Sequence, residues 1–238
     1  MAERYDCSRR GLARLPEELR TMTDVRELYV YDNQLATFPE WIGELTSLRV
    51  IDANRNRLES IPASIGRLLN LYYLYIAEQR LIELPDTIGG LASLAYLNAS
   101  HNALTTLPAT IADMIALVEL RLDDNALTEL PDGLRRLTKL RELHLTSNQI
   151  RELPAWLGEV TSLRRVSLRN NKLSEVPSEI AQLLHLRDLD LRGNNLRALP
   201  DSIVNLQSLE RLDIRWNSIA GTPAWLTQLE RQGCTVWR

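Results

Sequence analysis

Cysteine is scarce in this chain of 238 residues, which contains only Cys7 and Cys234. Two cysteines are too few for a disulfide framework, and a chain without disulfides is typical of a reducing compartment, so the sequence predicts a cytoplasmic location. Apolar runs are short as well, and none approaches the about 20 residues that span a bilayer. The charged start, residues 1–10, has no apolar signal region. We therefore expect no membrane association.

Aromatic residues and lysine are also few. A single phenylalanine accompanies a hydrophobic content of 45%, so aliphatic side chains must fill the core. Of the 28 basic residues only Lys139 and Lys172 are lysines, and arginine favours planar, bidentate contacts with carboxylates. The net charge of −3 gives no overall attraction to nucleic acid or to anionic membranes. A nucleic-acid partner is therefore not expected.

Catalytic and metal-binding motifs are missing from the sequence. The three histidines, His101, His144 and His185, have no HExxH or CxxC motif beside them, and we expect each at the surface rather than as a ligand or base. There is no GxSxG motif, no P-loop and no glycine-rich phosphate cradle. The sequence predicts no enzyme activity, no cofactor and no metal site.

A strict repeat dominates what is present. All ten prolines are 23 residues apart; they are Pro16, Pro39, Pro62, Pro85, Pro108, Pro131, Pro154, Pro177, Pro200 and Pro223. A period without insertion or slip indicates a solenoid of stacked units. We predict one domain over residues 2–231, made of ten 23-residue units of which the first is an N-terminal cap, and a capping strand over residues 232–238.

The unit at residues 117–139 shows how each repeat is built. Its apolar residues stand at unit positions 1, 4, 6, 11, 14, 18 and 21. Positions 4 and 6 have the period of a strand, and positions 18 and 21 have helical spacing after a proline that suits the first turn of a helix. Each unit predicts a strand, a turn and a one- to two-turn helix, with successive strands parallel. The cysteines lie at opposite ends of such a stack, so we expect them buried and unpaired.

Asparagine recurs at unit position 9, inside the apolar frame. The residues are Asn33, Asn56, Asn102, Asn125, Asn148, Asn171, Asn194 and Asn217. The turn after each strand leaves buried backbone groups, and an amide side chain carries both the donors and the acceptor that can bridge them from one unit to the next. We predict a structural asparagine ladder. Gln79 and Arg10 occupy the same position; we expect Gln79 to distort its unit locally and Arg10 to mark an open first unit.

The consensus LxxLxLxxNxLxxLPxxIxxLxx closely resembles the leucine-rich repeat, in the 23-residue type of intracellular Ras-group, plant and bacterial proteins. The resemblance covers residues 2–231. It implies an α/β solenoid, a right-handed leucine-rich-repeat horseshoe with a parallel concave β-sheet and short helices on the convex side. It also implies a protein-interaction module, either a scaffold or regulator of a small GTPase or phosphatase, or the recognition domain of a bacterial effector delivered into a host cell. No residue selects among these partners.

Side chains at strand positions 3, 5 and 7 point away from the core, and tyrosine is concentrated there. Six of the seven tyrosines fall on or beside these positions. The predicted partner-binding residues of this region are Tyr29, Tyr31, Val50, Tyr73, Tyr75 and Tyr96, with Tyr72 next to them. Tyrosine favours strands in general, but that preference does not explain why the later units have none. We predict an aromatic binding patch over the first four full units.

Charge on the same face separates along the chain. The predicted contacts are Glu119 and Asp123 in the middle, and Arg165, Arg169, Arg192, Arg211, Arg215 and Trp216 in the last third. Cross-strand ion pairs would account for some of them. Arginines outnumber acids in the last third, which favours a protein partner with an acidic patch. We expect the chain to be a monomer before it binds.

Tryptophan recurs on the helical side. Trp41, Trp156 and Trp225 share unit position 17, where we expect partial burial against the neighbouring unit rather than a second binding site. In the tail, residues 234–237 alternate like a closing strand, and Trp237 is predicted to cover the terminal core.

Overall fold

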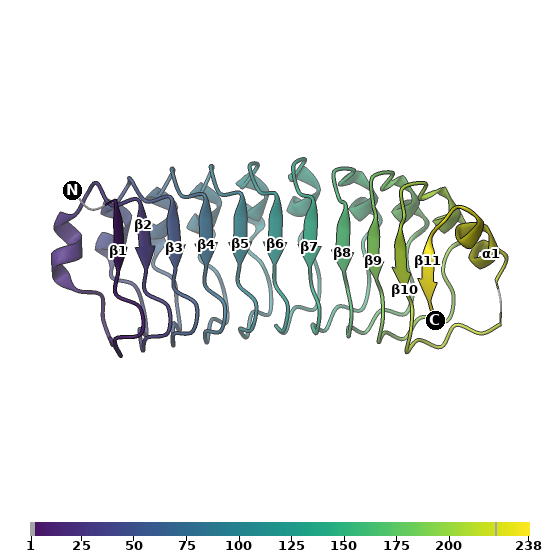
Figure 1. Ribbon diagram of the computed structural model, residues 1–238, viewed down its shortest axis with the longest axis horizontal. Helices are drawn as coiled ribbons and strands as arrows, with labels where there is room; N and C mark the ends of the chain where they lie inside the picture. The colour runs from purple at the N-terminus through teal and green to yellow at the C-terminus, as the bar shows by residue number, and fades with distance from the viewer. Residues whose placement is uncertain (1–2, 222) are drawn as a thin grey trace.

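The computed structural model describes residues 3–221 and 223–238, so Ala2, the first residue of the predicted domain, lies outside the described residues. One parallel sheet of eleven strands runs along the molecule, with the strands side by side in chain order (Figure 1). The strands are β1 Arg4–Asp6, β2 Glu27–Tyr29, β3 Val50–Asp52, β4 Tyr73–Tyr75, β5 Tyr96–Asn98, β6 Glu119–Arg121, β7 Glu142–His144, β8 Arg165–Ser167, β9 Asp188–Asp190, β10 Arg211–Asp213 and β11 Thr235–Trp237. The predicted α/β solenoid is confirmed.

Strand register follows the repeat without a slip. Tyr73 pairs with Tyr96, which is 23 residues later, and the same offset joins each pair of neighbours from β1 to β10. Apolar residues at the central strand position are buried in every unit from β2 to β10. The two outer residues of each strand consequently point to the opposite face, because side chains alternate along a strand.

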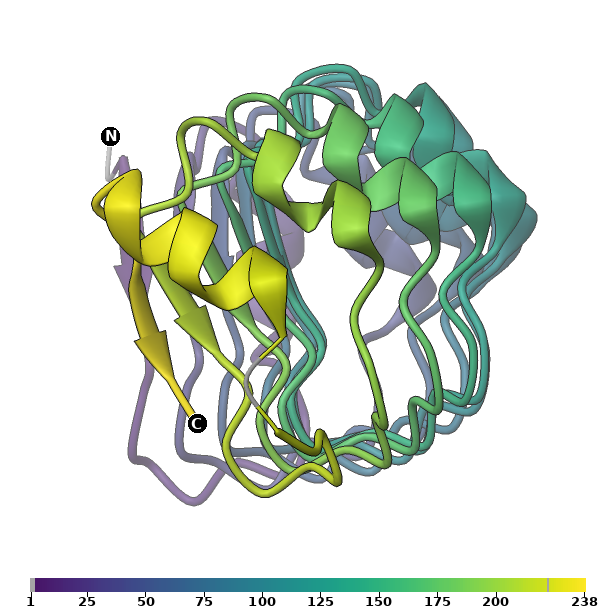
Figure 2. The same cartoon turned by 90° about the vertical axis from the view of Figure 1, so that its right-hand side faces the viewer.

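Short helices cover the other side of the sheet, as the end view in Figure 2 shows. Nine are five-residue 3-10 helices: η1 Glu17–Thr21, η2 Glu40–Glu44, η3 Ala63–Arg67, η4 Asp86–Gly90, η5 Ala109–Asp113, η6 Asp132–Arg136, η7 Ala155–Glu159, η8 Ser178–Gln182 and η9 Asp201–Asn205. Each begins directly after the repeat proline, whose carbonyl accepts the first helical N–H, as from Ile65 to Pro62 at 3.1 Å. Among the residues that the structure describes, only the last unit forms an α-helix, α1 Ala224–Arg231.

The core lies between the sheet and the helices. It is made almost entirely of leucine, isoleucine and valine, with Phe38 at one end. Trp41, Trp156 and Trp225 are buried against it, which confirms and exceeds the expected partial burial. Cys7 and Cys234 are also buried and do not pair, as predicted. No helix in the described residues is long and apolar enough to cross a bilayer.

Glycine at unit position 19 lets neighbouring 3-10 helices approach closely. A Cβ atom at Gly66 would lie 2.2 Å from the carbonyl oxygen of Thr87, and one at Gly43 would lie 2.4 Å from that of Ser64. Where Ala112 occupies the same position, the next unit offers Gly133 opposite. The helical stack is therefore packed backbone to backbone.

The position-9 amides connect the units. The Nδ2 group of Asn148 donates to the carbonyls of Leu122 at 2.9 Å and Leu145 at 3.1 Å, while its Oδ1 accepts the N–H of Leu127 at 3.0 Å. The other ladder asparagines repeat this pattern. Each ladder asparagine also donates a longer bond, of 3.2–3.5 Å, to the carbonyl two residues back in its own unit. A residue with positive φ precedes each of them; it is a non-glycine residue except at Gly193.

Gln79 keeps the two links to the preceding unit. Its amide nitrogen donates to Ala53 at 2.8 Å and its oxygen accepts the N–H of Leu58 at 3.0 Å. Within the unit, Gln79 donates to the carbonyl two residues back, that of Ala77 at 2.9 Å, and lacks the bond to the carbonyl three residues back that the asparagines make. The expected local distortion is wrong, because the strand register of this unit is unchanged. Arg10 makes no such bridge; its backbone N–H donates to Asn33 of the next unit at 3.0 Å.

The C-terminal cap differs from the prediction in one residue. The tail forms β11 as expected, but Trp237 pairs in register with Asp213 and stays 40% exposed. Val236 pairs with the buried Leu212 and packs against the core instead. Because side chains alternate along a strand, only one of the two neighbours can face inward, and the register assigns that place to Val236.

Candidate functional site

The outward face of the sheet is the surface on which the units differ, and we call it the strand face. Its first row consists of the residue that begins each strand, from Glu27 in β2 to Arg211 in β10. Its second row consists of the residue that ends each strand, from Tyr29 to Asp213. A third row follows two residues later, at unit position 7. Parallel register places members of each row on neighbouring strands.

Three tyrosines of the first and second rows, and a fourth directly before β4, form a cluster, which we call the tyrosine cluster. They are Tyr72, Tyr73, Tyr75 and Tyr96. The ring centroid of Tyr73 lies 6.3 Å from that of Tyr75 and 6.1 Å from that of Tyr96. The ring centroids of Tyr75 and Tyr96 are 4.9 Å apart. Tyr72 meets Tyr73 edge to face at 4.8 Å. Tyr72 and Tyr73 remain 46% and 38% exposed, so a large aromatic surface is open to a partner.

Tyr29 and Tyr31 do not join this cluster, which corrects the expectation of one aromatic patch. Asp52 of β3 stands between Tyr29 and Tyr75 in the second row. The guanidinium of Arg4 lies 4.2 Å from the ring centroid of Tyr29, and that of Arg9 lies 5.1 Å from Tyr31. The two outlying tyrosines therefore bind cations of the chain itself.

A hollow of about 480 Å³ borders the tyrosine cluster. Val50 and Tyr73 form part of its floor, and Glu27 and Arg49 contribute opposite charges to its wall. Val50 pairs in register with Tyr73, as the sequence predicted. The hollow gives the flat strand face a recess beside its most exposed aromatic rings.

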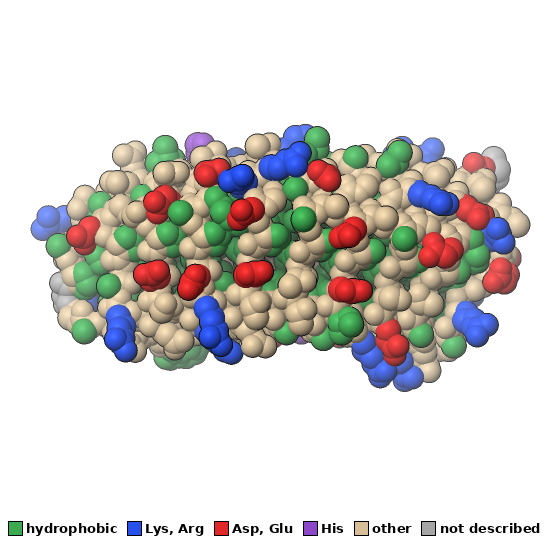
Figure 3. Space-filling model, turned by 180° about the vertical axis from the view of Figure 1, so that it is seen from behind, with side chains coloured by type: hydrophobic (Ala, Val, Ile, Leu, Met, Phe, Trp, Pro, Cys, Tyr) green, Lys and Arg blue, Asp and Glu red, His purple; other side chains and the backbone are tan. Residues whose placement is uncertain are grey.

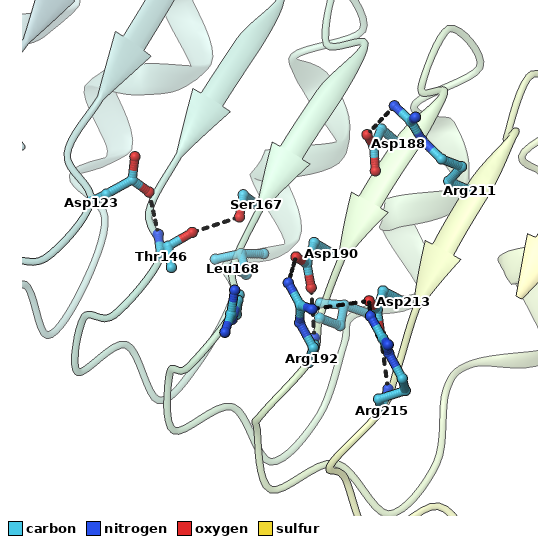
Figure 4. Close-up of polar contacts among 12 residues, drawn as sticks. Asp123, Thr146, Ser167, Leu168, Asp188, Asp190, Arg192, Arg211, Asp213 and Arg215 are labelled. Atoms are coloured by element: carbon cyan, nitrogen blue, oxygen red, sulfur yellow. Dashed lines mark hydrogen bonds and ion pairs between the residues drawn. The ribbon is translucent and has the colours of Figure 1, made fainter. Parts of the chain in front are cut away.

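Ion pairs run across the C-terminal half of the first row. Arg165 contacts Glu142 at 3.1 Å and Asp188 at 3.5 Å. Asp188 also accepts from Arg211 at 2.6 Å (Figure 4). The predicted surplus of free arginine is therefore not present here. The side chains are long enough to reach the acids on adjacent strands, which lie about 4.8 Å away.

The second and third rows hold a tighter network near the C-terminal end (Figure 4). Arg192 pairs with Asp190 at 3.0 Å and with Asp213 at 3.7 Å, and Arg215 also donates to Asp213. Burial raises the pKa of Asp190 above its usual value, although the N–H of Arg192 opposes the change. Burial would also raise the pKa of Asp213, but the hydrogen bonds from Arg215 outweigh it and lower that pKa.

Trp216 is 66% exposed at the edge of this network. The guanidinium groups of Arg192 and Arg215 lie 5.7 and 6.0 Å from its ring centroid. Arg215 also lies 5.7 Å from the ring of Trp237. The two exposed tryptophans therefore flank an arginine, an arrangement that the sequence did not reveal for Trp237.

Two predicted contact residues stand outside the ion pairs of the described residues. Asp123 accepts the backbone N–H of Thr146 at 2.7 Å, and the Thr146 hydroxyl meets that of Ser167 at 2.7 Å (Figure 4). Arg169 forms no ion pair within residues 3–221 and 223–238, and its buried Nε has no hydrogen-bond partner there. Among the third-row arginines of the described residues, Arg169 is the one without an ion pair.

Glu119, Glu142 and His144 meet in the middle of the strand face. The Nε2 atom of His144 lies 3.1 Å from a carboxylate oxygen of Glu142 and 4.0 Å from one of Glu119. Each of the three residues has one atom able to bind a metal, and these three atoms lie within 4.8 Å of one another. His144 is only 12% exposed at its side chain, so its expected place at the surface is wrong. Arginines already contact both carboxylates, Arg121 at Glu119 and Arg165 at Glu142, which makes the group a charge network. Its signal in the sequence is acidic and histidine side chains at facing positions of adjacent units.

Asp52, in the second row on β3, has no cationic partner in the described residues. The carboxylate accepts the backbone N–H of Asn54 at 3.1 Å and forms no ion pair within the described residues. Burial raises its pKa, and the charge of Asp6 two strands away adds to the effect. Its neighbours in the row, Tyr29 and Tyr75, are neutral.

Replacing Asp52 by asparagine should stabilise the protein at neutral pH. Because the folded pKa is raised above its usual 3.8, protonation of Asp52 favours the folded state, and that contribution is complete below pH 3.8 and lost as the pH rises through the folded pKa. We expect Asp52→Asn to raise Tm by about 2 °C at pH 7 and by nothing at pH 3, as measured by circular dichroism. An equal gain at both pH values would contradict this prediction.

Comparison with known proteins places the repeat in a family. A family model described as a leucine-rich repeat region matches residues 62–176 and 154–232, which together are more than half of the chain. The chain belongs to the leucine-rich repeat family. No curated protein sequence matches this leucine-rich repeat protein significantly. The resemblance predicted from the repeat consensus is confirmed.

Solved leucine-rich repeat structures share its fold. The ectodomain of the receptor kinase GASSHO1/SCHENGEN3 from Arabidopsis thaliana, in complex with Casparian strip integrity factor 2, is 29% identical with a TM-score of 0.79, over 94% of this chain and 31% of that one. The plant peptide hormone receptor RGFR1 in complex with RGF2 is 27% identical, with a TM-score of 0.71, over 87% and 38%. InlJ from Listeria monocytogenes is 22% identical, with a TM-score of 0.80, over 95% and 47%. This leucine-rich repeat protein thus spans less than half the length of each.

Proposed function

We propose that this leucine-rich repeat protein is a non-enzymatic interaction module that binds a protein or peptide partner on its strand face. The tyrosine cluster carries the proposal. Tyrosine side chains bury a large apolar area and keep a polar tip, and they are enriched among the residues that dominate binding energy. Seen from behind, the helical side carries dispersed charges of both signs among small apolar groups (Figure 3).

The scaffold suits binding without a large shape change. Each unit is fixed by strand pairing and by amide links to its neighbour. An interface of standard size needs about 800 Å² on each partner, which a few adjacent strands with their flanking turns can supply. Two solved relatives, GASSHO1/SCHENGEN3 and RGFR1, are each in complex with a named ligand. This likeness supports a peptide or protein as the class of partner.

The proposed contact has two parts. The tyrosine cluster, with Val50 and the adjoining hollow, supplies the apolar part. Arg169 and Trp216, with the unused donors of Arg165, Arg192, Arg211 and Arg215, supply the polar part at the other end, together with Glu119 and Asp123. The ion pairs hold the arginine side chains in place before a partner arrives, which reduces the ordering cost of binding.

Substitution of Tyr73 or Tyr75 by alanine tests the proposal. Proteins captured on the immobilised wild-type chain would be identified, and the partner would then be purified and titrated by calorimetry. Each substitution is expected to weaken binding about tenfold or more, because each removes a central aromatic contact. Circular dichroism spectra should stay the same, since both rings lie outside the core.

Leu184→Ala provides the matched control. Leu184 is an exposed apolar residue that lies outside the strand face, and its loss should leave the affinity unchanged. Equal affinities for the wild type and both tyrosine variants would assign the cluster to structure and remove the basis of the proposal.

A further inference from the structure

Acidic side chains in the first two rows of the strand face fall into two groups. From β6 to β10 every one has a cationic partner, as with Glu119 and Arg121, or Asp190 and Arg192. On β1, Asp6 pairs with Arg4. Glu27 and Asp52, on β2 and β3, form no ion pair within residues 3–221 and 223–238. The exceptions are neighbours, and both border the tyrosine cluster.

Of these two carboxylates, Asp52 gives the stronger evidence for a missing cationic partner, because it is partly buried. Its strand neighbours on both sides place an aromatic ring beside it, Tyr29 on β2 and Tyr75 on β4. Burying a charge without a partner is costly, and the single hydrogen bond from Asn54 leaves most acceptor positions of the carboxylate unused. Glu27 has its own free acceptor capacity, since it receives only the hydroxyl of Tyr29 at 3.3 Å.

Tyrosines on this same surface already bind guanidinium groups. Arg4 lies over Tyr29 at 4.2 Å and Arg9 over Tyr31 at 5.1 Å. No arginine or lysine of the described residues lies over the rings of the tyrosine cluster. Tyr75 thus offers the same kind of ring face next to a carboxylate that lacks a cation.

We propose that Asp52, with the tyrosine cluster beside it, is the recognition site for an arginine side chain of the partner. The inference rests on the proposed function and specifies its chemistry. A guanidinium can lie flat against a ring while two of its N–H groups donate to one carboxylate, which combines the two interactions that the site offers. A lysine ammonium is a point charge and satisfies only one of these demands at a time.

Short capped peptides test this site directly. Acetyl-Gly-Arg-Gly-amide would be titrated into the full chain and followed by ¹H–¹⁵N NMR, with acetyl-Gly-citrulline-Gly-amide as the uncharged analogue of nearly equal shape. We expect the arginine peptide to shift the amide signals around Asp52 and Tyr75, and to bind about tenfold more tightly than the citrulline peptide. Its lysine counterpart is expected to bind with intermediate affinity.

Two variants assign the effect to the site. Asp52→Asn should weaken binding of the arginine peptide about tenfold, while Glu83→Gln, at an exposed carboxylate outside the strand face with no ion pair in the described residues, should leave it unchanged. Equal binding of arginine and citrulline peptides, shifts centred elsewhere, or wild-type affinity in Asp52→Asn would each overturn the proposal. If partner binding still depended on Tyr73 under those outcomes, the strand face would keep its proposed function and lose only this chemistry.

Discussion

Replacing Asn148 by alanine is expected to lower the free energy of unfolding by about 3–5 kcal/mol. It leaves one buried N–H without a partner, at about 1–3 kcal/mol, and removes one of the two amide hydrogen bonds at each of two carbonyls, at about 0.5–1.5 kcal/mol each. The N–H is that of Leu127. The carbonyls are those of Leu122 and Leu145, which keep their bonds to Asn125 and Asn171. The loss should appear as a Tm lower by about 10 °C or more. Urea denaturation followed by circular dichroism measures it.

Two further variants separate the ladder from the loss of any polar residue. Asn195 is exposed and its side chain makes no hydrogen bond in the described residues, so Asn195→Ala should change stability by less than about 0.5 kcal/mol. Asn148→Gln should recover most of the loss, since Gln79 keeps both links to the preceding unit. A mild effect of Asn148→Ala would show that the amide bridges contribute little to the stack.

Gly66→Ala is expected to destabilise the protein by about 3 kcal/mol, at the upper end of the usual cost of overpacking. The new methyl group would lie 2.2 Å from the backbone oxygen of Thr87. A backbone atom held by its own unit cannot move aside as a flexible side chain can, so adjacent helices must separate. Thermal unfolding measured by circular dichroism would show the loss.

Ser64→Ala is the control for that substitution. Ser64 is buried on η3, and its hydroxyl has no hydrogen-bond partner in the described residues. Removing the hydroxyl should leave stability equal or slightly higher. If Gly66→Ala were as stable as Ser64→Ala, the close contact between helices would not limit which residues position 19 accepts.

The fold was predictable because the repeat fixes the neighbours of every residue. Once the period is known, Tyr73 must lie beside the residue 23 positions away, Tyr96, whatever the side chains prefer. The repeated asparagine was predictable for a similar reason, since a polar side chain in an apolar frame must satisfy buried groups. The helix type was less accessible: apolar residues three apart, as at positions 18 and 21, fit one turn of either an α-helix or a 3-10 helix.

The details of the site depended on information that the repeat does not contain. The rows follow from register, but an arginine can reach an acid on either neighbouring strand or on its own, as Arg165 and Arg192 show. The sequence therefore showed which charges lie on the strand face but not which of them form ion pairs, and it predicted an exposed His144. Tyr29 was grouped with the cluster because the reach of Arg4 across its ring is a property of side-chain conformation.

The constant strand register also fixes the distances between residues along the strand face. Asp52 ends β3 and Arg169 follows β8, so five strand spacings of about 4.8 Å separate the two ends of the proposed contact by about 24 Å, the length of about seven residues of extended peptide. Gain or loss of one whole unit between them would change that length by a single step and leave the chemistry at each end intact. Selection could thus match the protein to longer or shorter ligands in discrete increments.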